Sequence, residues 1–403
     1  MLRSSLALAT CALGLAACAD VDTATASGDD LNRSADALSK SDGILTERPG
    51  QDSGPDQGGI QFPRDPDRFQ QDQSHQMRDS DCLDWAETPF TSRTIDGNVT
   101  ALERIQPWTR SITGDVVLNA DVELDNVRAL RCVESIGGTL RIGGQPDVVR
   151  IVMPQLRELG SLEIRAMENL EALRMHKLQD VGQITIVDAP ALEFVRLPKV
   201  KTLPDGLALE GLSLASLDGV LPELEEAGSV SLVDLTQFDS FLHDRVALGG
   251  GTVELVGLDG LTDLAGFPFK EVGELVISDN ASLQSTAGAS IEDGALVEIS
   301  GNPILADLDV LSTAEVLGAT IIAANPSLET LDGFAGVRSV EGDLVIADHA
   351  SLIDTTGLDA LMRVQGDLRI TGAAALSAEA ISGLALSLAE VDVTGALEVS
   401  GVE

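Results

Sequence analysis

The sequence predicts a mainly β fold, a right-handed parallel β-solenoid of about 13 rungs with 22–24 residues each, behind a disordered N-terminal tether. Three observations predict it. Aliphatic residues recur at a near-constant interval, another apolar residue usually stands two positions before each, and the preceding segment lacks apolar clusters. Intervals of this length are typical of repeat architectures, in which each rung buries its inward side chains only against its neighbours.

The recurring aliphatic residues, here called anchors, define the rungs. A residue two positions earlier is also mostly apolar, which is the period of a strand with one buried face. We expect each anchor to stack on the next at about 4.8 Å. The predicted anchors are Leu118, Ile142, Ile164, Ile186, Leu209, Leu232, Leu255, Ile277, Ile299, Ile322, Ile346, Ile370 and Val393.

Residues 1–17 have the features of an export signal, with Arg3 followed by an apolar run too short to span a bilayer. The run ends in Leu15-Ala16-Ala17-Cys18, which resembles the bacterial lipoprotein signal. The resemblance implies that Cys18 begins the mature chain and carries the lipid, so that the membrane is a partner. Ala19 after the cysteine favours the outer membrane of a bacterial envelope, with either face possible. An ordinary signal peptide is the alternative.

Residues 18–80 are rich in Asp, Ser, Gly, Gln and Pro, and we expect an acidic, disordered tether there. The whole chain has 65 acidic against 26 basic residues, a net charge of -39. This balance disfavours nucleic acid and anionic headgroups, which require basic patches. It favours solubility, divalent cations or a basic partner.

Two cysteines remain after export, Cys82 and Cys132. In an oxidising compartment one pair is expected to form a disulfide, and the reduced pair is the alternative.

Two segments resemble receptor L domains, a family of leucine-rich-repeat-like solenoids. They are Asn325–Phe334 and Val340–Ile346, and Leu130–Ile142 resembles the first-rung motif of that family. The resemblance covers residues 81–403 and implies one long stack or two fused L domains. It also implies that Cys132 pairs with Cys82. The resemblance is specific for the fold and weak for function, because this fold serves many unrelated partners.

Two sets of repeat positions suggest sites. Asp343, Asp367 and Glu390 occupy one position in the last three predicted rungs, where stacked carboxylates could bind calcium. The alternative is a structural Gly-Asp strand opening with no cofactor. Asn280, Asn302 and Asn325 share another position, which predicts a structural asparagine ladder. His349 falls in a turn, where a solvated side chain is expected.

Outward positions predict an apolar patch of Val276, Leu296, Ile321 and Val345, which would mark an interface unless a loop covers it. No nucleophile elbow, zinc-protease motif or phosphate loop appears. The sequence therefore favours a non-enzymatic envelope protein that presents a solenoid face for recognition of a protein or glycan, or for adhesion. A structural spacer and a polysaccharide-active enzyme are the alternatives. At the C-terminal end we expect either a cap formed by residues 374–388 or end-to-end self-association.

Overall fold

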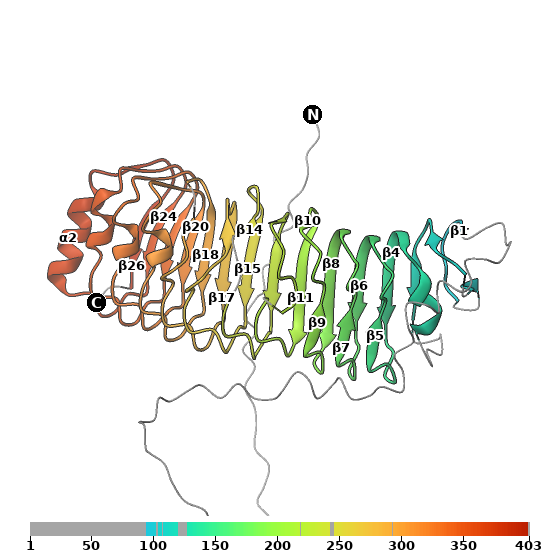
Figure 1. Cartoon of the computed structure of the whole chain (residues 1–403). Coiled ribbons are helices and arrows are strands. Elements are labelled where there is room, and N and C mark those ends of the chain that lie inside the picture. The colour runs from blue at the N-terminus through green and yellow to red at the C-terminus, as the bar shows by residue number, and fades with distance from the viewer. Residues whose placement is uncertain are drawn as a thin grey trace, which may run out of the picture. The chain divides into compact units, whose positions relative to one another are not determined.

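A computed structural model confirms the parallel β-solenoid. It describes residues 94–401 except 102–103, 107, 120–126, 218, 242–245 and 292. Figure 1 shows the strands side by side along the stack, with the helix α2 (Ala378–Leu388) beside the last rungs. The expected export signal and tether lie outside the described residues.

The largest sheet contains one main strand from each rung. These strands pair in parallel, each with the next, from β3 to β26. They are β3 (Val116–Leu118), β4 (Ser135–Gly143), β6 (Glu158–Arg165), β8 (Asp180–Ala189), β11 (Gly206–Leu212), β13 (Val230–Val233), β15 (Thr252–Val256), β17 (Glu274–Ser278), β18 (Leu296–Ser300), β20 (Thr320–Ala323), β22 (Leu344–Ala347), β24 (Leu368–Thr371) and β26 (Leu397–Ser400).

Shorter strands form the other sides of the rungs. Within the main sheet, short strands precede several main strands: β1 (Thr94–Ile95), β2 (Ser111–Ile112), β10 (Thr202–Leu203), β12 (Glu226–Ala227), β14 (Val246–Ala247) and β16 (Phe269–Lys270). A three-stranded sheet contains β5 (Arg150–Val152), β7 (Ala172–Arg174) and β9 (Phe194–Arg196). A four-stranded sheet contains β19 (Val316–Leu317), β21 (Ser339–Val340), β23 (Arg363–Val364) and β25 (Asp392–Val393). The 3-10 helices are η5 (Val127–Cys132), η6 (Asp309–Leu311), η7 (Asp332–Phe334) and η8 (Thr356–Ala360).

The anchors from Leu118 to Ile370 form the predicted interior column. Each is at most 1% exposed, and the strand register places each beside the next. Stacked aliphatic side chains of this kind make one continuous apolar core, which is the main source of stability in a solenoid.

The last predicted anchor is wrong. Val393 lies in β25 and pairs with Val364 in the four-stranded sheet, whereas Val399 pairs with Ile370 and occupies the anchor column. The cause is α2, which begins after the N-cap Ser377 and lengthens this rung to 29 residues between Ile370 and Val399. The helix falls within the expected cap, residues 374–388, and buries Leu384 and Leu388.

A left-handed residue ends most main strands, two positions after the anchor. Asp188, Asp234, Asp279 and Asp348 have φ values of 55°, 52°, 57° and 60° there. Asp tolerates this conformation because its short polar side chain can hydrogen-bond locally. The repeated turn directs each chain segment from the main sheet toward the next side of its rung.

The glycines before the main strands are required by close packing and not by an unusual φ. Gly160 and Gly182 have ordinary φ values. A Cβ on Gly160 would lie 2.7 Å from the carbonyl oxygen of Gly137, and one on Gly182 would lie 2.8 Å from that of Gly160. Real Cβ atoms do not approach so closely, so only glycine lets these rungs stack at the bend.

Candidate functional site

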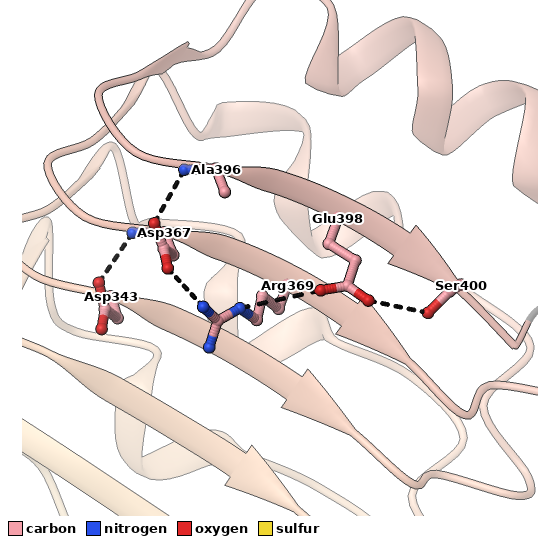
Figure 2. Close-up of polar contacts among 6 residues, drawn as sticks. All are labelled: Asp343, Asp367, Arg369, Ala396, Glu398 and Ser400. Carbon is pink, nitrogen blue, oxygen red and sulfur yellow. Dashed lines mark hydrogen bonds and ion pairs between the residues drawn. The ribbon is translucent and has the colours of Figure 1, made fainter.

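The predicted acidic column is a hydrogen-bond ladder (Figure 2). Asp343 Oδ1 accepts the backbone N–H of Asp367 at 2.8 Å, and Asp367 Oδ1 accepts that of Ala396 at 2.8 Å. Arg369 donates to the other oxygen of Asp367 at 2.5 Å and lies 3.9 Å from Glu398. Each aspartate therefore links its rung to the next, and the charge of Asp367 is paired.

The three expected calcium ligands do not come together. Because Leu368 pairs with Leu397, Ala396 follows Asp367 in the column, and Glu390 lies between α2 and β25. The error has the same cause as the misplaced last anchor, the helix inserted in this rung. Across the described residues no three His, Cys, Asp or Glu side chains form a group that could hold a metal ion.

The predicted apolar patch is interrupted. Val276 pairs with Glu298, which pairs with Ile321, so a carboxylate separates the two apolar side chains. Ile321 and Val345 are direct neighbours. Leu296 belongs to a different column, where it packs beside Gly318. Leu296 and Ile321 are exposed by 44% and 39%, and the other two are half-buried, so the apolar surface is smaller than expected.

The asparagine column forms the ladder predicted for it. Asn280, Asn302 and Asn325 are fully buried, and the Oδ1 of each later residue accepts the backbone N–H of the one before, at 3.0 Å. Their Nδ2 groups donate to main-strand carbonyl oxygens of the preceding rung, such as Ile277 O and Ile299 O. This network satisfies polar groups inside the core and leaves nothing for a ligand.

His349 continues that column, and the expectation of a solvated histidine is wrong. It is fully buried, with Nδ1 3.1 Å from Asn325 O and Nε2 3.1 Å from Ile322 O. Burial lowers the pKa of His349, and the two carbonyl contacts, with Asp348, oppose that effect only in part. Since carbonyl oxygens only accept, a neutral ring satisfies one contact and a charged ring satisfies both.

A groove crosses the N-terminal rungs where short strands bend into main strands. Its volume is about 780 Å³, within the range of ligand sites. Its floor includes Gly137, Gly160 and Gly182, which carry no side chains to fill it. Its lining also includes Ser111, Ser135, Glu158, Asp180 and Thr202, which are partners in register on successive rungs. The groove thus presents a row of hydroxyl and carboxylate groups about 4.8 Å apart.

The outward main-sheet face beside the groove holds a closed ion network. Glu163 accepts hydrogen bonds from Arg141 and Arg165, each at 2.6 Å. Burial alone would raise the pKa of Glu163, but these two bonds outweigh it and lower the pKa. Both arginines of this network therefore have an acidic partner within the chain.

A second group of cations lacks such partners. The cationic cluster consists of Arg174, His176, Lys177, Arg196 and Lys199, on the side of the stack that contains β7 and β9. Arg174 pairs in register with Arg196, and each lysine follows its arginine by three residues. Within the described residues no ion pair joins these five side chains to a carboxylate. Burial, then the charges of Arg174 and Arg196, lower the pKa of His176.

Composition alone concealed this cluster, because a net charge of -39 averages over the whole chain. The segments Arg174-Met175-His176-Lys177 and Arg196-Leu197-Pro198-Lys199 repeat Arg and Lys at an offset of 22 residues. That offset is one rung, so comparing charges at the rung period was the signal that could have revealed the cluster.

The remaining predicted residues lie mostly outside the described part. Cys18 and Cys82 are among them, while Cys132 ends η5 and is half-buried. Lipidation and the Cys82–Cys132 pairing stay predictions. None of the described helices is both long and apolar enough to cross a membrane.

Comparisons with known proteins do not identify a family: neither a protein-family model nor a curated protein matches the chain.

Proposed function

We propose that this chain is a non-enzymatic, lipid-anchored cell-envelope protein that recognises an extended ligand on its solenoid surface, as its resemblance to receptor L domains implies. The observation that supports recognition most is the groove, because this open depression crosses several rungs and presents polar groups at a regular spacing. A pure spacer has no need of such a surface.

The chemistry of the groove supports binding and not turnover. Glu158 and Asp180 are exposed neighbours among serine and threonine hydroxyls, and no histidine lines the groove. A nucleophile needs an adjacent base within hydrogen-bond reach, and Ser135 instead donates to Ser111 at 2.9 Å. A polysaccharide-active enzyme would require activity that a single outward carboxylate substitution abolishes.

A pulldown from envelope extract tests recognition. We expect one saturable partner to be retained by the full-length chain and lost by Thr202→Trp, which fills the groove from its wall. Thr262→Trp is the matched control, because Thr262 is exposed in a loop outside the groove. Equal retention by wild type and Thr202→Trp would leave the spacer as the better description.

The lipidation of Cys18 and the C-terminal end of the stack need separate tests. Replacing Cys18 with Ala should prevent lipidation and release the protein from the membrane fraction, and protease treatment of intact cells would report the exposed face. Leu397 and Val399 are 52% and 39% exposed, although their counterparts Leu368 and Ile370 are fully buried. End-to-end association through β26 would cover them, and a monomeric mass by light scattering at high concentration would exclude it.

A further inference from the structure

The cationic cluster differs from the ion pairs that other rungs form. In those pairs a basic side chain meets an acid: Arg141 and Arg165 meet Glu163, Lys201 meets Glu225, and Arg369 meets Asp367. At the cluster, Arg174 stands directly beside Arg196. Like charges opposite each other in a sheet are destabilising. The whole chain has 65 acidic residues, yet no carboxylate in its described part forms an ion pair with Arg174 or Arg196. Cations left without an acidic partner are expected on a surface that binds anions.

The geometry defines how the anions must be spaced. Arg174 and Arg196 occupy adjacent strands, about 4.8 Å apart. Lys177 and Lys199 each follow their arginine by three residues, so every rung of the cluster contributes two cations. A linear polyuronate carries one carboxylate on each sugar, and a sugar advances the polymer by a distance close to one rung. Guanidinium groups bind carboxylates through two parallel hydrogen bonds.

Apolar side chains flank the cations. Val152 precedes Arg174 in the same column and is 38% exposed, and Phe194 lies two residues before Arg196 and is 37% exposed. They offer contact to the C–H face of a pyranose ring. Glu171 and Glu193 lie just before β7 and β9, away from the lysines, so anions are favoured at the lysine end of the cluster.

Acidic residues outside the cluster repel polyanions that extend beyond it, and this limits which polyanion can bind. Duplex DNA carries one charge per about 1.7 Å of its axis, so most of its phosphates would face no cation on a two-rung cluster. An anionic bilayer is a continuous charged plane and would also meet the acidic rungs. A polyuronate has a charge spacing that the cluster can match without bringing further anions against the rest of the protein.

We infer that the cationic cluster of Arg174, Lys177, Arg196 and Lys199 is a binding site for a linear acidic polysaccharide of the uronate type, laid along the stack with its carboxylates on successive rungs. The inference deepens the proposed recognition function by naming a ligand class, and it depends on a surface separate from the groove.

Titration of the full-length chain with polygalacturonate tests it. We expect saturable binding that weakens as salt rises, because each bound carboxylate releases counterions. The double variant Arg174→Gln/Arg196→Gln should bind at least about tenfold more weakly, which is about 1.4 kcal/mol. Arg338→Gln/Arg363→Gln is the matched control, since it removes the same charge from exposed positions in the C-terminal rungs and should bind within about twofold of wild type. Fully methyl-esterified polymer, which lacks the charges, should not bind.

Other outcomes overturn the inference. Equal losses in both double variants would show that net charge alone governs binding. Tighter binding to duplex DNA, or to phosphatidylglycerol vesicles than to polygalacturonate, would assign the cluster to another class of anion. Loss in Thr202→Trp without loss in the arginine double variant would place the polymer in the groove, leaving recognition intact and the cluster without this role. Cooperative melting transitions close to that of wild type would establish that the variants are folded.

Discussion

Like charges stack on adjacent rungs in the Asp343–Asp367 column and in the Arg174–Arg196 column, and the surroundings of the charges differ between the two. In the Asp343–Asp367 column, backbone N–H groups and Arg369 occupy the carboxylate oxygens, so the stack joins rungs together. In the Arg174–Arg196 column, the described residues contribute no ionic partner. Repetition of a charge therefore does not distinguish a structural ladder from a binding surface. The distinction depends on whether other groups of the protein hydrogen-bond to the stacked charges.

The asparagine column is the uncharged and fully buried form of the structural ladder, so breaking it should have the largest effect. Asn302→Ala removes donors to Ile277 O and Ser300 O and the acceptor for Asn280 N. We expect a loss of about 3 kcal/mol in unfolding free energy, because each buried group left unsatisfied costs about 1–3 kcal/mol. Denaturant unfolding measures it. Ser300→Ala, which removes only a half-buried contact to Glu298, should cost less than about 0.5 kcal/mol.

The acidic column should give a smaller effect that separates hydrogen bonding from charge. Asp367→Ala removes the acceptor for Ala396 N and the partner of Arg369, and we expect a loss of about 1–2 kcal/mol. Asp367→Asn keeps an acceptor oxygen and should recover about half of it. If both variants were as stable as wild type, the ladder would not hold the last rung. If both lost the same amount, the charge and not the hydrogen bond would be responsible.

His349 makes the interior column sensitive to pH. Its pKa in the folded chain lies below the ordinary value of 6.5, with burial as the main cause. In the window from about 6.5 down to the folded pKa, the unfolded chain binds more protons, so stability falls as pH falls. The slope from this one group cannot exceed about 1.4 kcal/mol per pH unit. Unfolding curves from pH 7 to pH 5 should show the stability of wild type falling below about pH 6.5.

His349→Asn is the informative comparison, because it restores the residue type that the three preceding rungs use at this position. Its amide can donate to Ile322 O without titrating. We expect the variant to match wild type near pH 7 and to lose less stability on acidification. An identical pH dependence in both proteins would mean that other groups cause the acid sensitivity.

The sequence predicted the columns well where rung length was constant and failed where it changed. Leu118 through Ile370 recur at 22–24 residues, and aliphatic burial enforces that register at every rung. The α2 insertion breaks the interval, so a constant interval predicts Val393 and Glu390 in columns that contain Val399 and Ala396. A helix adds residues without adding a rung, and anchor spacing alone cannot detect it.

Site features were harder to predict because they depend on neighbours across rungs. The turn position of His349 suggested solvent, yet the asparagine column at the same place after Ile277, Ile299 and Ile322 is interior. The predicted apolar patch omits Glu298, which lies between Val276 and Ile321 in the same column. In both cases the burial and the neighbours of a residue can be predicted only from all members of its column, taken in order.

The smallest expected effect has the opposite sign and tests the comparison most directly. Arg196→Gln relieves the repulsion from Arg174, so the unfolding free energy should rise by about 0.2–0.5 kcal/mol at low salt. The gain should shrink as salt screens the pair. Arg141→Gln, which removes a partner of Glu163, should instead lower stability. If Arg196→Gln were destabilising at low salt, Arg196 would have a stabilising role in the free protein, and the cationic column would belong with the structural ladders and not with the surfaces left for a ligand.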